Sequence, residues 1–141
     1  MATHSYKDLR VWQTAMELTE RVYGVTAQLP PSEKFALGDQ LKRCAVSVPS
    51  NIAEGQKRLN RQETIQFCGI ALGSSAELET QLILTNKIYK IPVAEELRSC
   101  EEVAKMLTGL IKALRSKNCR LLRRRSEYNM PVAAFTNRLG R

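Results

Sequence analysis

Four stretches of the chain carry apolar residues at intervals of three and four positions, and this spacing limits the fold more than any other feature. Such intervals place side chains on one face of an α-helix, whereas strands alternate every second residue. We find no convincing alternating segment, and Pro30, Pro31 and Pro92 stand between the periodic stretches. The sequence therefore predicts an all-α protein.

The expected helices cover residues 8–29, 33–55, 60–89 and 93–117. Ser32 is the expected N-cap of the second helix and Asn60 that of the third. Pro49 is expected to kink the second helix. Four long helices joined by short turns predict an antiparallel up-down-up-down bundle over residues 1–117. Trp12, on the same face as Leu9 and Met16, is expected to anchor the core or a subunit interface. The Arg-rich, polar segment 118–141 is predicted to be a basic C-terminal tail.

Several classes of enzyme and of membrane protein are disfavoured by what the sequence lacks. It has one histidine, four cysteines without a CxxC pair, and neither a Walker loop nor GxGxxG. We therefore expect no metal site, no cofactor and no catalytic residues. No apolar run approaches the roughly 18–20 residues of a membrane span, and the first residues lack a signal peptide's apolar region. A cytoplasmic protein without a membrane partner is expected.

Positive charge is concentrated in a few places along the chain. Lys and Arg total 22 against 14 Asp and Glu, a formal charge of +8, and residues 118–141 hold six arginines and one glutamate. In an up-down-up-down bundle the chain start, the second turn and the end of the fourth helix share one pole, which would also collect Lys7, Arg10 and Lys112. Such a pole suits a phosphate backbone, and a solvated helix end is the alternative. The candidate nucleic-acid-binding residues are Lys57, Arg58, Arg61, Arg115, Lys117, Arg120, Arg123, Arg124 and Arg125.

A polar stripe crosses the second and third expected helices at helical spacing. Arg43 is expected within reach of Glu77 or Gln81, because these two helices should be neighbours. The pattern is interpreted as a structural polar network or a subunit interface, with an active centre or ligand pocket as the less favoured alternative. The stripe consists of Gln40, Arg43, Ser47, Asn51, Glu54, Ser74, Glu77 and Gln81.

A second stripe on the third helix consists of small residues. Gly69, Gly73 and Ala76 lie four and three positions apart. A glycine inside a helix costs roughly 1 kcal/mol relative to alanine, so two of them predict close packing of another backbone. That backbone could belong to the same chain or to another subunit.

Three segments carry a resemblance to a known family: LRVWQTA at 9–15, QLKRCAVSVPSNIAEGQKR at 40–58, and FCGIALGSSAELETQL at 67–82. Together they resemble the four-helix-bundle proteins of the 23S ribosomal RNA intervening sequence. The resemblance implies a small bacterial cytosolic protein that assembles into a ring-shaped homopentamer. The family is more distantly similar to the accessory protein of diversity-generating retroelements, which binds nucleic acid and a reverse transcriptase. The resemblance to the family implies no catalytic residues, and the family has no recognised counterpart of the Arg-rich tail.

These observations lead to one favoured function and two alternatives. The favoured function is a non-enzymatic, oligomeric protein that binds nucleic acid, RNA or an RNA–DNA intermediate, through the basic pole and tail. The first alternative is a homopentameric protein-interaction scaffold or reverse-transcriptase accessory subunit. The least favoured alternative is an enzyme that uses the carboxylates of Glu54 and Glu77.

Overall fold

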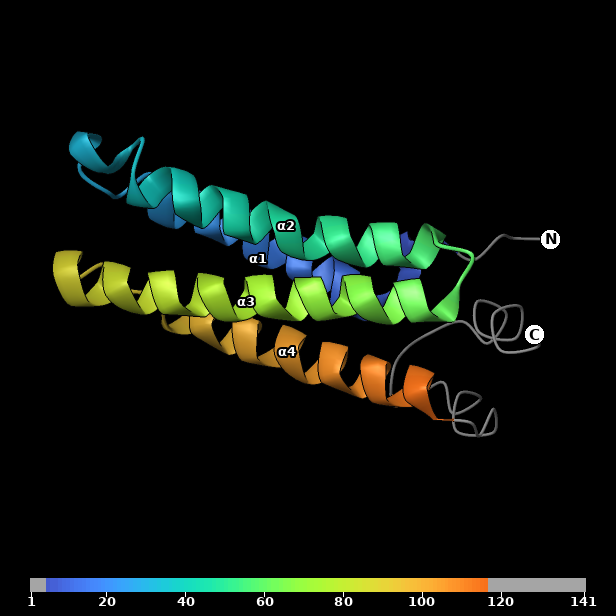
Figure 1. Cartoon of the computed structure of the whole chain (residues 1–141). Coiled ribbons are helices and arrows are strands. Elements are labelled where there is room, and N and C mark those ends of the chain that lie inside the picture. The colour runs from blue at the N-terminus through green and yellow to red at the C-terminus, as the bar shows by residue number, and fades with distance from the viewer. Residues whose placement is uncertain (1–4, 117–141) are drawn as a thin grey trace.

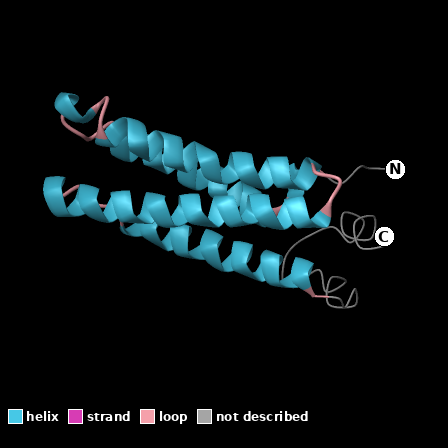
Figure 2. Cartoon of the chain, in the orientation of Figure 1, coloured by secondary structure: helices cyan, strands magenta, loops and turns pink. Residues whose placement is uncertain are grey.

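The computed structural model describes residues 5–116, and within them the chain forms helices and no strand (Figure 2). The prediction of an all-α chain with four long helices is confirmed for this part of the protein. Two short 3-10 helices precede α1 and α2. The elements are η1 (Tyr6–Asp8), α1 (Arg10–Thr26), η2 (Pro31–Glu33), α2 (Leu37–Lys57), α3 (Arg61–Tyr89) and α4 (Ala94–Arg115).

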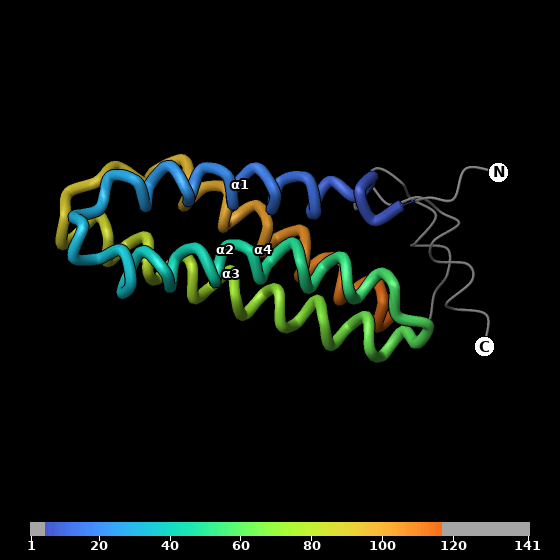
Figure 3. Tube along the Cα trace, turned by 90° about the horizontal axis from the view of Figure 1, so that it is seen from above, coloured from blue at the N-terminus to red at the C-terminus, as the bar shows by residue number. Residues whose placement is uncertain are grey.

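The four helices lie alongside one another with their connections at two ends (Figure 1). The beginning of α1, the α2–α3 turn and the end of α4 lie at one end, and the view from above shows the same grouping (Figure 3). The α1–α2 and α3–α4 connections lie at the opposite end. Helix α1 packs mainly on α2 and α4, and α3 packs mainly on the same two helices.

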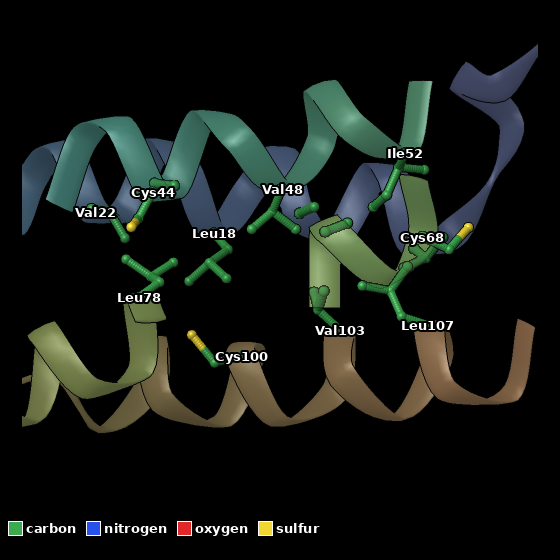
Figure 4. Close-up of a cluster of buried hydrophobic side chains, with 14 of the residues drawn as sticks. Leu18, Val22, Cys44, Val48, Ile52, Cys68, Leu78, Cys100, Val103 and Leu107 are labelled. Carbon is green, nitrogen blue, oxygen red and sulfur yellow. The ribbon is translucent and has the colours of Figure 1, made fainter. Parts of the chain in front are cut away.

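The core runs along the inside of the four helices and is built from leucine, valine, isoleucine, alanine and cysteine side chains. Figure 4 shows side chains from all four helices converging on this interior. Burying one leucine or valine side chain contributes roughly 1.5–3 kcal/mol, so this core stabilises the fold without a disulfide between the buried cysteines. Fully buried members include Leu18, Val22, Leu41, Val48, Ile52, Leu78, Leu82, Val103 and Leu107.

The buried face of α1 differs from the predicted one at Trp12 and Met16, whereas Leu9, just before the helix, is buried as predicted. Val11, Leu18 and Val25 are buried, whereas Trp12 is only half-buried and Met16 is exposed. The buried stripe is thus turned by about one residue relative to the Trp12–Met16 stripe. Trp12 packs on the edge of the core and leaves its outer side accessible.

The start of α2 also differs from the prediction. Ser32 lies inside the short helix η2 and does not cap α2, which begins only at Leu37. The backbone N–H of Leu37 donates instead to the Glu33 carboxylate at 3.2 Å. Phe35, which lies within the expected helix 33–55, is in the connection instead and is 86% exposed.

Pro49 lies buried inside α2, and the helix continues through it to Lys57. Proline has no N–H, so Pro49 cannot donate to the carbonyl four residues earlier, that of Ala45. The Thr19 hydroxyl of α1 lies 3.0 Å from this Ala45 oxygen and 2.8 Å from the carbonyl of Ala15. A neighbouring helix thereby supplies a donor where the proline removes one.

Both ends of α3 have identifiable caps. The Asn60 side chain accepts the N–H of Gln62 at 2.8 Å, which confirms Asn60 as the N-cap. At the other end Lys90 takes the left-handed conformation, with φ at 57°. The Asn86 amide donates to the carbonyl of Ile91 at 3.0 Å and holds this turn.

Candidate nucleic-acid interface

The start of α1, the α2–α3 turn and the end of α4 lie at one end of the bundle (Figure 1), and basic residues occur in all three of these segments. Lys57–Arg61 and Arg115, distant in sequence, lie at the same end, as predicted from the sequence. We call this surface the basic end. Its described cations are Lys7, Arg10, Lys57, Arg58, Arg61, Lys112 and Arg115, and the acidic residues at or in contact with it are Asp8, Glu54, Glu63 and Glu102.

The α2–α3 turn at the basic end is tight because its two helices approach closely at Gly55. A Cβ built on Gly55 would lie 2.9 Å from the Cβ of Phe67 and 3.4 Å from the carbonyl oxygen of Thr64. Helix α2 then closes with the Arg58 N–H donating to the Gly55 carbonyl at 3.3 Å. The cations that flank this turn are therefore held on a well-defined backbone.

Two of the cations at the basic end are neutralised by neighbours. Arg58 pairs with Glu54 at 2.6 Å and with Glu63 at 4.0 Å, and its guanidinium lies 4.6 Å from the centre of the Phe67 ring. Arg10 pairs with Glu102 of α4 at 3.0 Å. Sequence reasoning treated Arg58 as a leading phosphate contact, but its charge is already compensated.

The other cations form no ion pair with the described part of the chain. Arg61 is half-buried at the first position of α3, and Lys112 and Arg115 are exposed in the last turn of α4. The Lys57 ammonium lies 6.0 Å from the centre of the Tyr6 ring. These side chains, together with Lys7, leave an uncompensated positive surface that a polyanion can contact.

The remaining predicted contacts lie outside the described residues. Lys117 and the tail arginines Arg120, Arg123, Arg124 and Arg125 follow Ser116, where the described chain ends. They stay predictions.

The polar stripe between α2 and α3 contains a hydrogen-bonded cluster at its centre. The hydroxyls of Ser47 and Ser74 lie 2.9 Å apart and join the two helices. The Asn51 amide donates to the carbonyl and hydroxyl oxygens of Ser47 at 2.8 and 3.0 Å. Gln40 is exposed on the same helix. This part of the stripe has the form of a structural network.

The expected contact of Arg43 with Glu77 or Gln81 is wrong. Arg43 pairs with Asp39 one turn earlier on its own helix, at 3.0 Å, and stays largely exposed. An i,i+4 pair on one helix keeps both charges in water, which costs less than moving a guanidinium between two helices. Glu54, at the other end of the stripe, pairs with Arg58.

A thiol and a carboxamide occupy the α2–α3 seam beside Glu77. The Gln81 side-chain N–H contacts the Glu77 carboxylate at 3.3 Å and the Cys44 sulfur at 3.6 Å. The Gln81 carbonyl oxygen is buried and has no partner in this seam. Burial first, and then Glu77, raise the pKa of the Cys44 thiol to about 11. Cys44 is therefore a neutral thiol near pH 7 and a poor nucleophile.

The small-residue stripe does not pack against another helix of this chain. Gly69, Gly73 and Ala76 face outward on α3, and a Cβ at either glycine would meet no atom within 4 Å. Close packing against another helix within residues 5–116 is therefore excluded at both glycines, and packing against another subunit, the other alternative, stays a prediction. The same outward side of α3 carries exposed apolar side chains, namely Ile70, Ile83, Leu84 and Ile88.

A shallow apolar hollow between α1 and α2 was missed by sequence reasoning. It measures about 320 Å³, and its lining includes Tyr6, Trp12, Met16, Val46 and Pro49. Tyr6 and Trp12 meet edge to face with ring centres 5.5 Å apart. The only sequence signal was the position of Trp12 beside Met16.

Residues 5–116 contain neither a metal-binding cluster nor a membrane-spanning helix. No group of three or more His, Cys, Asp and Glu side chains there is arranged to hold a metal ion. No helix in this part is both long and apolar enough to cross a membrane.

Comparison with known proteins identifies a family but no curated relative. A search of curated proteins found no match. Residues 7–109 match the family described as "23S rRNA-intervening sequence protein", and this match covers α1, α2, α3 and most of α4. Because the match spans well over half of the chain, the protein belongs to the 23S rRNA-intervening sequence protein family.

Proposed function

We propose that this protein binds nucleic acid, RNA in preference, at the basic end and does so without catalysing a reaction. The observation that carries the proposal is the gathering there of Lys7, Lys57, Arg61, Lys112 and Arg115, none of which forms an ion pair within residues 5–116. Phosphates displace condensed counterions when they meet such cations, and this release supplies sequence-independent affinity. The family description refers to ribosomal RNA and supports the choice of RNA.

The mode of recognition follows from the aromatic residues near the basic end. Tyr6 already contacts Trp12 and Lys57, and Phe67 lies under the Arg58 guanidinium. Neither ring is free to form a platform for successive stacked bases. Backbone contact and recognition of RNA shape are therefore the proposed mode.

The tail extends the same proposal. The described chain stops at Ser116, directly after α4 ends at the basic end. Lys117, Arg120 and the arginine run Arg123–Arg125 follow within ten residues, so the tail would add its charge to the same surface.

The salt dependence of RNA binding tests this function. If about five phosphates are contacted, log affinity for a fluorescent RNA hairpin should fall with log salt at a slope of roughly −3 to −5. Arg61→Ala and Arg58→Ala form a matched pair three residues apart. Arg61→Ala should reduce the slope by about 0.7–0.9. Arg58→Ala should change it less, because Arg58 is already paired with Glu54 and Glu63. A slope near zero in the wild type would refute RNA binding through phosphate contacts.

A second candidate function, a homo-oligomeric scaffold, is favoured by the outward face of α3. Ile70, Ile83, Leu84 and Ile88 are exposed there beside Gly73, among the polar side chains of Glu77, Thr80 and Lys87. Several large apolar side chains exposed on one helix face indicate a contact surface. We propose that second copies cover this face, that the helices form an antiparallel up-down-up-down bundle, and that the bundles form a ring, with a pentamer as the expected number. The reverse transcriptase implied by the more distant resemblance stays a predicted partner.

Sedimentation of two variants tests the assembly. Ile83→Glu should dissociate the oligomer, because it places a charge in the proposed contact. Glu20→Gln, an exposed position on α1, should leave the assembly intact. Equal sedimentation of Ile83→Glu and the wild type would contradict this interface.

A nuclease assay tests the absence of catalysis. Purified protein should leave RNA intact with and without divalent metal. Cleavage that is lost in Glu77→Gln would instead support the carboxylate enzyme.

A further inference from the structure

The most exposed large apolar side chain of the described protein is at the tip of the basic end. Leu59, in the α2–α3 turn, is 97% exposed. Arg58 and Asn60 are its chain neighbours, and Lys57 and Arg61 stand two residues to either side. Single exposed leucines are common on protein surfaces, so exposure alone assigns no role. Leu59 differs from such residues because it lies in a rigid turn and is surrounded by positive charge.

Both residues beside Leu59 are fixed by capping bonds. The Arg58 N–H donates to Gly55, and the Asn60 side chain accepts the N–H of Gln62. The Asn60 carbonyl also accepts the backbone N–H and the hydroxyl of Thr64 at 3.1 and 3.2 Å. The Arg58 side chain is held by the Glu54 carboxylate below the tip. Leu59 is thus presented on a preorganised turn, and little conformational entropy is lost when it is buried in a complex.

We propose that Leu59 is an apolar wedge that packs against an unstacked base and directs the protein to RNA with an unpaired nucleotide. This inference rests on the proposed function, because the flanking cations must first bring phosphates to the turn. A regular A-form duplex keeps its base faces stacked and shows mainly hydroxyls and base edges. A bulged nucleotide exposes an apolar face at little cost, and leucine is among the residues that enter such gaps.

An anionic membrane is a less suitable partner for this tip. One leucine buries far fewer carbons than a myristoyl chain, and a single such chain gives only marginal membrane binding. In an RNA complex the cations supply the affinity, so one apolar contact suffices to select among structures.

Phe35 provides a matched control at the opposite end of the bundle. It is also a large apolar side chain in a connection, 86% exposed, with the Lys34 ammonium 5.3 Å from its ring centre. If exposed apolar tips act non-specifically, Phe35 and Leu59 should behave alike. If the basic end positions the RNA, only Leu59 should matter.

The test compares two fluorescent RNA hairpins that differ by one bulged nucleotide next to 2-aminopurine, a base whose fluorescence reports unstacking. We expect the wild type to bind the bulged hairpin about tenfold more tightly, as partial burial of one leucine supports. Leu59→Ser should abolish this preference and the 2-aminopurine change while it retains the salt slope. Leu59→Met and Phe35→Ser should keep both. Because Leu59 is almost fully exposed, its replacement should leave the fold intact.

Five results would overturn the wedge, and they separate its failure from that of the proposed function. Equal binding of both hairpins with a steep salt dependence removes the wedge and leaves the RNA function in place. A bulge preference that survives Leu59→Ser, or disappears in Phe35→Ser, also removes it. Failure to bind either hairpin removes both ideas. Leu59-dependent binding to phosphatidylserine vesicles without a bulge preference would assign the tip to membranes instead.

Discussion

The two ends of the bundle are built alike, from helix termini and short connections, but only the basic end is followed in sequence by the Arg-rich tail. At the end opposite the basic end, Glu33 accepts hydrogen bonds from the Tyr89 hydroxyl and the Leu37 N–H, and Asp39 pairs with Arg43. Its basic residues outnumber its acidic ones by two. The basic residues are Lys34, Lys42, Arg43, Lys87, Lys90 and Arg98, and the acidic ones are Glu33, Asp39, Glu95 and Glu96.

The basic end holds seven described cations and four acidic residues, counting Glu102, which pairs with Arg10, and the acidic side chains are not spread evenly among the cations. Glu54 and Glu63 both contact Arg58. Asp8 is used locally, because its carboxylate accepts the N–H of Ser5 in the cap of η1. Lys34, Lys42, Lys87 and Lys90 at the opposite end form no ion pair within residues 5–116 either, so pairing alone does not separate the two ends. The basic end is distinguished by the sequence that follows α4, because Lys117 and the tail arginines come directly after it.

Removing the uncompensated cations should have the largest effect. Lys57→Ala, Arg61→Ala and Arg115→Ala combined should weaken RNA binding about a hundredfold near 0.1 M salt, because three phosphate contacts are lost. Fluorescence anisotropy with an RNA hairpin measures this. The matched triple at the opposite end, Lys34→Ala, Lys87→Ala and Lys90→Ala, removes the same charge and should change affinity less than about twofold. Similar losses in both triples would show that net charge alone controls binding.

The close approach of α2 and α3 at the basic end should be sensitive to one methyl group. Gly55→Ala places a Cβ against Phe67 and should lower the free energy of unfolding by about 1–3 kcal/mol. Gly24→Ala, in α1, meets no atom within 4 Å and should raise it by up to about 1 kcal/mol. Urea denaturation gives both values. A neutral Gly55→Ala would mean that the turn is looser than described.

The opposite end should gain stability from a glycine. Lys90 is left-handed with φ at 57°, a conformation that costs a residue with a Cβ roughly 1–2 kcal/mol. Lys90→Gly should therefore stabilise the protein by about 1 kcal/mol in urea denaturation. Lys87→Gly, inside the last turn of α3, should destabilise it by about the same amount. Destabilisation by both substitutions would contradict the left-handed cap.

The smallest effect expected is a pH dependence at the opposite end. The Tyr89 hydroxyl first, and then the Leu37 N–H, lower the pKa of Glu33 below its ordinary value. The folded state therefore binds this proton less readily than the unfolded state, so the contribution is complete above the ordinary glutamate pKa. It is lost as pH falls through the lowered value. Denaturation midpoints of the wild type and Glu33→Gln should converge in acid, and a constant difference would exclude this role for Glu33.

The helices could be predicted from the sequence because apolar spacing and punctuation agree with the final packing. Asn60 caps α3 and Pro92 separates the last two helices, as local chemistry requires. The start of α2 was predicted wrongly because the Glu33 carboxylate, rather than the Ser32 side chain, accepts the first N–H of the helix. The same carboxylate also accepts a hydrogen bond from Tyr89, which is far away in the sequence. The buried face of α1 was predicted wrongly at two positions because Trp12 and Met16 are as apolar as Val11 and Leu18. Apolar spacing alone does not show which of these two adjacent helix faces is buried.

The position of the candidate site could be predicted from the sequence, but the ion pairs of its arginines could not. Connectivity of consecutive helices was enough to expect Lys57, Arg61 and Arg115 together. Compensation of Arg10 by Glu102 and of Arg43 by Asp39 depends on side-chain geometry that spacing does not specify. The outward position of Gly73 likewise required the packing of α3 against both neighbours.

The most direct test of the central claim is lysine protection by RNA in the full-length protein. Acetylation of each lysine, with and without an RNA hairpin, is read by mass spectrometry, so that both ends are compared within one sample. We predict that RNA protects Lys7, Lys57 and Lys112 and leaves Lys34, Lys87 and Lys90 as reactive as before. Equal protection at both ends, or protection confined to Lys34, Lys87 and Lys90, would contradict binding at the basic end.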